Sequence, residues 1–123
     1  MIVQATNCNR TYAAKDKSLA ADFVSDVIDF KDMCHGSIHA RWYGATGALD
    51  GTFRIYASDF PDVASFDPNG TLIDGAVFAI HSLGDGSRIW IRDRLSFRYA
   101  LVRYSSGTVS GGTVDVVAIG KKA

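Results

Sequence analysis

The side chains best suited to chemistry are two histidines and a cysteine that stand close together in the sequence. His35 and His39 are four residues apart, and Cys34 directly precedes the first of them. On a helix this spacing places both imidazoles on one face, where they suit a metal ion such as zinc. The segment alternates like a strand, in which positions four apart lie about 13 Å from each other. We therefore expect polar histidines on a strand face and no metal site.

Aspartate is the only acidic residue type in the chain, and several aspartates fall in or near predicted loops. The loop aspartates are Asp50, Asp59, Asp62, Asp67, Asp74 and Asp85. Such oxygens can bind calcium, but the ligand spacing of a calcium-binding loop is absent. Hydrogen bonding of each carboxylate to its own backbone explains these residues more simply.

No arrangement of residues typical of an active site is visible. Residues 105–107 (Ser-Ser-Gly) lack the flanking glycines of a nucleophile elbow. Residues 107–112 are rich in glycine but lack the lysine and the strand-to-helix context of a phosphate loop. Because no nucleophile, base and oxyanion donor can be assembled, we expect no enzyme, no catalytic residues and no cofactor.

Aromatic residues on predicted strands leave one binding function open. They are Trp42, Tyr43, Tyr56, Trp90, Tyr99 and Tyr104. Strand aromatics are more often core or interface residues. If some rings are exposed beside loops, Trp42 and Trp90 are the candidate ligand aromatics of a carbohydrate-binding or host-adhesion module.

The strongest structural signal is a pair of alternating segments around a glycine-rich reversal. Residues 36–43 and 52–57 each place apolar side chains at every second position, as half-buried strands do. The inward-facing residues are Ile38, Ala40 and Trp42 in the first segment, and Phe53, Ile55 and Ala57 in the second. Residues 46–51 between them have turn chemistry, so the pattern predicts a hairpin.

Further strands follow at roughly even spacing. Strands are predicted at 76–82, 88–92, 96–104 and 113–119, with shorter candidates at 2–6, 19–24 and 27–30 and turns at 66–70 and 84–87. In 88–92 the side chains of Arg88, Trp90 and Arg92 share one face. Near Ala100 and Leu101 the alternation shifts, which indicates a bulge or burial on both faces.

Seven to nine short strands indicate an all-β fold, an antiparallel β-sandwich of jelly-roll type. The polar first segment, residues 1–17, is predicted to be an extended N-terminal arm or loop, and residues 18–123 to form the sandwich domain. An arm of this kind can reach another subunit and become ordered on assembly.

The balance of charged residues limits the kinds of molecule that we expect the protein to bind. Lysine and arginine total 13, as do the acids, so the formal net charge is zero and a dedicated nucleic-acid binder is not expected. Residues 88–103 are locally basic and residues 50–85 are acidic. This asymmetry is either a solvated face or a contact between the basic patch of one copy and the acidic patch of the next.

The cysteines, the first six residues and the length of the apolar stretches indicate the cellular compartment in which we expect the protein. Cys8 and Cys34 are expected to be reduced, small and buried, although the spacing also permits a disulfide. Residues 1–6 lack the basic start and apolar run of a signal peptide, and no apolar stretch reaches the length of a membrane span. We expect a protein made in the cytoplasm, with no membrane partner.

The order of these segments resembles a group of small β-sandwich structural proteins from the virions of tailed phages and related viruses. The matching segments are 42–44 (Trp-Tyr-Gly), 51–59 (Gly-Thr-Phe-Arg-Ile-Tyr-Ala-Ser-Asp), 99–104 (Tyr-Ala-Leu-Val-Arg-Tyr), 106–108 (Ser-Gly-Thr) and 112–121. The resemblance covers most of residues 18–122 and supplies no catalytic residues.

The resemblance implies a non-enzymatic virion part: a capsid, decoration, head–tail or tail component, assembled in the host cytoplasm. Its partners would be copies of itself and other virion proteins, because such parts act through repeated contacts. Candidate assembly contacts are Asn9, Arg10, Tyr12, Arg88, Arg92 and Arg94. Under the alternative function, the partner is a surface glycan.

Overall fold

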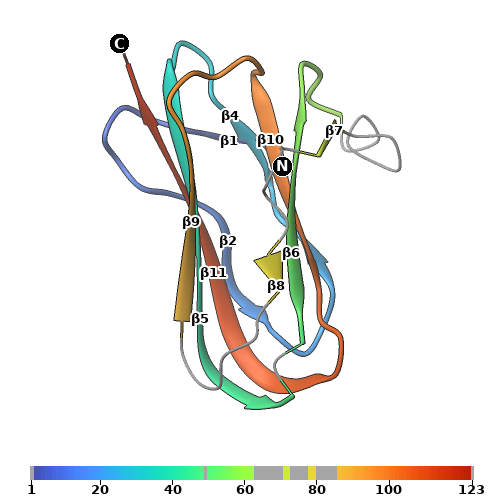
Figure 1. The fold of residues 1–123 in the computed structure, drawn as a ribbon. Coiled ribbons are helices and arrows are strands. Elements are labelled where there is room, and N and C mark those ends of the chain that lie inside the picture. The colour runs from blue at the N-terminus through green and yellow to red at the C-terminus, as the bar shows by residue number, and fades with distance from the viewer. Residues whose placement is uncertain (1, 49, 63–70, 73–77, 80–85, 123) are drawn as a thin grey trace.

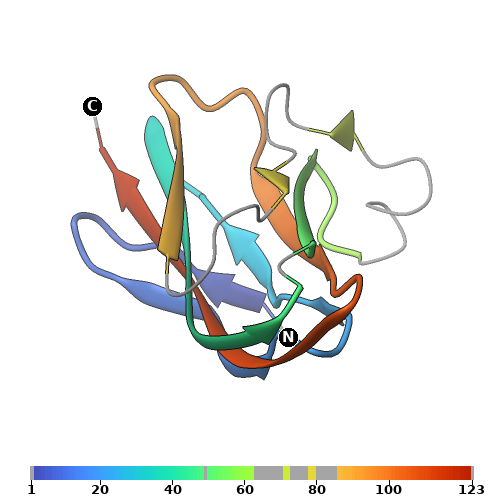
Figure 2. The same cartoon turned by 60° about the horizontal axis from the view of Figure 1, so that its bottom comes forward.

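The computed structural model describes residues 2–48, 50–62, 71–72, 78–79 and 86–122. Every regular element within them is a β-strand, and two sheets face each other across one apolar core, as Figures 1 and 2 show. The predicted β-sandwich is therefore confirmed. The structure assigns eleven strands in the described residues. Three of them have only two residues, which leaves eight longer strands.

The two sheets differ in size and in strand order. The four-stranded sheet contains, from edge to edge, β2 (Thr11–Ser18), β11 (Val109–Lys121), β5 (His35–Gly47) and β9 (Gly86–Arg92), each antiparallel to its neighbours. The larger sheet runs β1 (Ile2–Gln4), β4 (Val27–Asp29), β10 (Tyr99–Ser105), β6 (Thr52–Ser58) and β7 (Thr71–Leu72). In addition, β3 (Phe23–Val24) pairs with β10, and β8 (Phe78–Ala79) pairs with β6.

The predicted hairpin is wrong, although both of its strands exist. β5 pairs with β11 and β9, whereas β6 pairs with β10, β7 and β8 in the opposite sheet. The reversal after Gly47 therefore crosses from one sheet to the other. Alternation shows which side chains point inward, but it does not say whether two strands lie beside or across from each other. Here Trp42 of β5 stacks on Phe53 of β6 across the sandwich, with ring centroids 5.9 Å apart.

The N-terminal segment is extended, as predicted, but it is not a detached arm. β1 lies parallel to β4 at one edge of the larger sheet, and β2 lies antiparallel to β11 at one edge of the smaller sheet. Three alanines of this segment are buried in the core: Ala5, Ala13 and Ala14. Polar composition concealed these strands because an edge strand exposes most of its side chains, including Lys15 and Lys17.

The core is centred on aromatic rings from both sheets. Phe53 is fully buried and contacts Trp42, Trp90 and Tyr104, which come from three other strands. The irregular alternation in β10 reflects burial on both faces, because its register with β6 runs without a shift. Leu101 belongs to a second small cluster on the far side of the larger sheet, so that β10 is covered on both sides.

Two aspartates hold the short connection between β10 and β11. Asp50 accepts hydrogen bonds from the backbone and hydroxyl of Thr108, at 2.7 and 2.6 Å, and Asp22 accepts two from Ser106. These carboxylates hold the turn, and β11 already begins at Val109. The predicted turn at 66–70 lies outside the described residues, as do Asp67, Asp74, Asp85 and most of the predicted strand at 76–82.

Both cysteines are free thiols, but they are exposed rather than buried as predicted. Cys8 adopts a positive φ of 61° at a bend, where its side chain has no core to enter. Cys34 immediately precedes β5 and is likewise exposed.

Candidate interaction site on strand β9 and the outer sheet face

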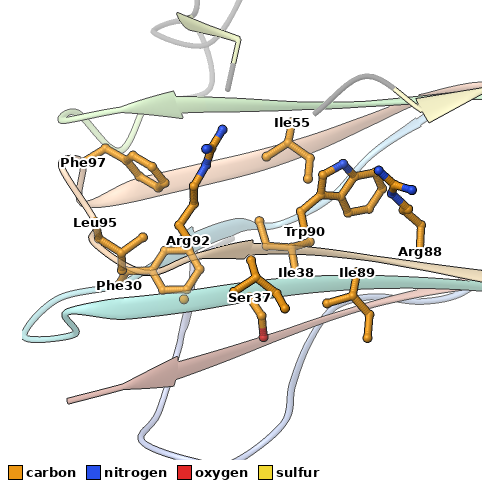
Figure 3. Close-up of a pocket in the computed structure, with 12 residues that line it drawn as sticks. Phe30, Ser37, Ile38, Ile55, Arg88, Ile89, Trp90, Arg92, Leu95 and Phe97 are labelled. Carbon is orange, nitrogen blue, oxygen red and sulfur yellow. The ribbon is translucent and has the colours of Figure 1, made fainter. Parts of the chain in front are cut away.

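Strand β9 presents two faces of opposite character at the edge of the four-stranded sheet. Among the described strands it pairs only with β5. Arg88, Trp90 and Arg92 share one face, as predicted, and Figure 3 shows that they lie on the same side as Ile55 of the opposing sheet. Ile89 points the other way, away from the sandwich. An edge strand with inward arginines and outward isoleucines inverts the usual arrangement.

The inner face of β9 lines a groove of about 200 Å³ between the two sheets. Its apolar wall includes Phe30, Leu95 and Phe97, which gather at one end in Figure 3. Arg92 and Arg88 lie on either side of Trp90, whose ring is partly buried and meets Phe53 edge-on at 6.3 Å.

The two tryptophans singled out by the sequence have different positions. Trp42 is only 2% exposed and belongs to the core, so it is not a ligand aromatic. Gly86 packs against the Trp42 indole so closely that a β-carbon there would lie 2.7 Å from the ring. Trp90 alone of the pair lines the groove. Sequence alternation could not separate the two, because both lie on inward faces of their strands.

On its other side, β9 continues an apolar surface across the sheet. We call the side of the four-stranded sheet that points away from the larger sheet the outer face. Ile89 and Ile91 are 50% and 67% exposed there. The strand register places Ser37 opposite Ile91, and Ile119 opposite Ser37. Ser37 of β5 therefore lies between Ile91 of β9 and the partly buried Ile119 of β11.

The next row of the outer face carries a histidine between apolar residues. His39 of β5 lies opposite Ile89 on one side and Val117 of β11 on the other, and Val117 in turn lies opposite Tyr12 of β2. Tyr12 is 42% exposed. Two exposed isoleucines in line with partly buried apolar residues form the kind of patch that marks interaction sites.

The candidate assembly contacts fall into separate places. Asn9, Arg10 and Tyr12 are exposed at or before the start of β2, at the sheet edge opposite β9. Arg88 and Arg92 line the groove, and Arg94 is exposed just after β9. The structure thus brings the six residues to two opposite edges of one sheet rather than to one patch.

The basic stretch 88–103 is not one surface either. Arg98 forms a two-pronged ion pair with the buried carboxylate of Asp29, at 3.0 and 3.2 Å. This bond lies within the chain and ties the loop before β10 to β4. Arg98 is therefore a structural residue of the sandwich.

Sequence reasoning missed the outer face itself. The pattern Arg-Ile-Trp-Ile-Arg in residues 88–92 shows that Ile89 and Ile91 oppose the arginines, but it does not show which face is buried. Among the described residues no three histidine, cysteine or aspartate side chains gather as a metal site does. Within the same residues, no helix is long and apolar enough to cross a membrane.

No protein-family model matches the chain, and no curated protein matches it.

Proposed function

We propose that this chain is a non-enzymatic structural subunit of a virus particle, acting through contacts with copies of itself and with other particle proteins. The observation that carries the proposal is the outward exposure of Ile89 and Ile91 on the outer face. The fold is consistent with it, since jelly-roll sandwiches are widely used in viral capsids.

The two edges of the four-stranded sheet are poor contact sites, which favours its outer face. If two copies paired their β9 strands antiparallel about Trp90, Arg88 of one would lie opposite Arg92 of the other. Like charges at such positions destabilise a strand pair. The β2 edge carries Lys15 and Lys17, and its ladder with β11 has two register shifts, both of which oppose edge pairing.

A second copy of the chain is the occupant that we assign to the outer face. A two-fold contact would lay the exposed Ile89 and Ile91 of one copy against the same two residues of the other. The formal net charge of zero means that copies do not repel each other as they approach. Stacked sheets of this kind pack about 10 Å apart, with side chains interdigitating.

The test of the biological assignment is the composition of particles. Virus particles produced by cells that carry this coding sequence are purified on a density gradient, and their proteins are identified by mass spectrometry. We expect the chain to co-purify with intact particles in many copies. Its presence only in the unassembled fraction would overturn the assignment.

A second candidate function is the binding of an acidic sugar in the groove, which the position of Trp90 between Arg88 and Arg92 favours. An aromatic face stacks on a sugar ring, and a guanidinium binds a carboxylate. Glycan-array binding that is lost in Trp90→Ala would decide for this function; the absence of binding by the unmodified chain would exclude it.

A further inference from the structure

The outer face also contains a polar pocket, at the end that adjoins β2. The pocket has a volume of about 260 Å³. Its lining residues come from β5, β11 and the start of β2: Arg10, Tyr12, His39, Arg41, Asp115, Val117 and Ile119. Arg10 and Tyr12 from one segment thus share a small hollow with His39 and Arg41 from another segment that is distant in the sequence.

The cations of this pocket are only partly neutralised. Arg41 donates to Asp115 at 2.9 Å, and the same carboxylate accepts the backbone N–H of Asp16 at 2.7 Å. Asp115 is 4% exposed, so its charge is committed to these partners. Arg10 is exposed, and within the described residues no carboxylate pairs with it. One positive charge at the pocket is therefore not balanced.

His39 adds a polar atom that lacks a partner. Its Nε2 is buried, and within the part of the chain that the structure describes no group forms a hydrogen bond with it. A buried polar atom without a hydrogen bond carries a desolvation cost. Burial, and then the charges of Arg10 and Arg41, hold the pKa of His39 below its ordinary value. The imidazole is therefore neutral at neutral pH, and with its proton on Nε2 it is a hydrogen-bond donor.

These groups have the chemistry of an anion site. A guanidinium, a phenol hydroxyl and an imidazole N–H all donate to oxygen, and hydrogen bonds to an ionised acceptor are the stronger kind. Val117 and Ile119 supply an apolar floor that weakens competition from water. We propose that this pocket binds an oxyanion, a phosphate or carboxylate group, with Arg10 as its principal ligand and the imidazole of His39 in its wall. The proposal does not rest on self-association of the chain.

The experiment is an NMR titration of the imidazole nitrogens of His39 with sodium phosphate and, separately, with sodium acetate, against sodium chloride at equal ionic strength. Phosphate or acetate is expected to move these resonances saturably. The anion should raise the pKa of His39, as a close opposite charge does. Saturation by only one of the two anions identifies which oxyanion the pocket accepts and supports the site.

Two arginine variants test whether the anion binds in this pocket and not elsewhere on the protein. Arg10→Ala should weaken the apparent affinity at least about tenfold, the size expected for a charge-assisted hydrogen bond. The control Arg94→Ala also removes an exposed arginine, outside the pocket, and should bind as the unmodified chain does. No saturable shift with either anion, or an equal loss in both variants, would overturn the proposal.

Discussion

His39 of β5 lies directly opposite Ile89 of β9, and these two side chains mark the boundary between two halves of the outer face. On the Ile89 side the surface is apolar and exposed, whereas on the His39 side it carries Arg10 and Arg41 around a pocket. One sheet face therefore combines a patch suited to a second copy with a pocket suited to an anion.

Tyr104→Phe should destabilise the fold. The hydroxyl of Tyr104 donates to the carbonyl oxygen of Leu19 at 2.8 Å inside the core. Burial, together with the charges of Asp50 and Asp22, raises the pKa of Tyr104 to about 12. Removing the hydroxyl leaves a buried carbonyl without its donor, at a cost of about 1–3 kcal/mol in the free energy of unfolding.

Urea denaturation measures that change, with Tyr12→Phe as the control because the Tyr12 ring is 42% exposed. The control should unfold at the same urea concentration as the unmodified chain. Equal midpoints for all three proteins would contradict the role assigned to Tyr104.

Stability should fall as the pH drops below about 6.5, the ordinary pKa of histidine, and His39 should contribute to that fall. The pKa of His39 is lowered in the folded state, mainly by burial. The unfolded chain then binds more protons between the two pKa values, so acid favours unfolding. The stability contribution is complete above the unfolded pKa and is lost as pH falls through the folded one.

His39→Gln removes this titration and should flatten the dependence of the unfolding free energy on pH below about 6.5. The control His35→Gln changes a histidine on the same strand outside the Arg10 pocket. An unchanged slope in His39→Gln would show that His39 does not couple folding to protons.

The two tryptophans should respond differently to truncation. Trp42→Ala removes a buried ring that stacks on Phe53 and should cost about 3–5 kcal/mol of stability. Trp90→Ala removes a partly buried ring at the groove and should cost clearly less. Thermal unfolding of both variants checks the order. A larger loss for Trp90→Ala would contradict the assignment of Trp42 to the core.

Deletion of residues 1–17 should unfold or strongly destabilise the protein. This segment contains β1 and β2, and its buried Ala5 and Ala13 fill part of the core. A detached arm would leave the far-ultraviolet circular dichroism and the unfolding transition unchanged. Preservation of both signals in the deleted protein would contradict the strand pairing described above.

The sequence predicted strand positions better than strand neighbours. Alternation correctly identified Ile38, Trp42 and Phe53 as inward-facing, because side-chain direction is a local property of a strand. It failed on the hairpin and on the N-terminal segment, because pairing depends on contacts between distant parts of the chain. β2, for example, pairs with β11 nearly one hundred residues later.

The candidate site was harder to predict for the same reason. The pocket joins His39 of β5, Asp115 of β11 and Arg10, which directly precedes β2, and no local spacing links them. The alternation in residues 88–92 does predict that Ile89 and Arg88 lie on opposite faces of the strand. Only the packing of β9 against the larger sheet shows that the isoleucines are the exposed group.

Sedimentation equilibrium tests the central claim that the outer face joins copies of the chain. The unmodified protein should show a mass above the 13.3 kDa of one chain that falls on dilution. The double variant Ile89→Thr, Ile91→Thr should remain at the single-chain mass. Phe60→Thr, a control that removes a 65% exposed ring just after β6, should behave as the unmodified protein does. A single-chain mass for the unmodified protein at every concentration, or an unchanged assembly in the double variant, would contradict the account.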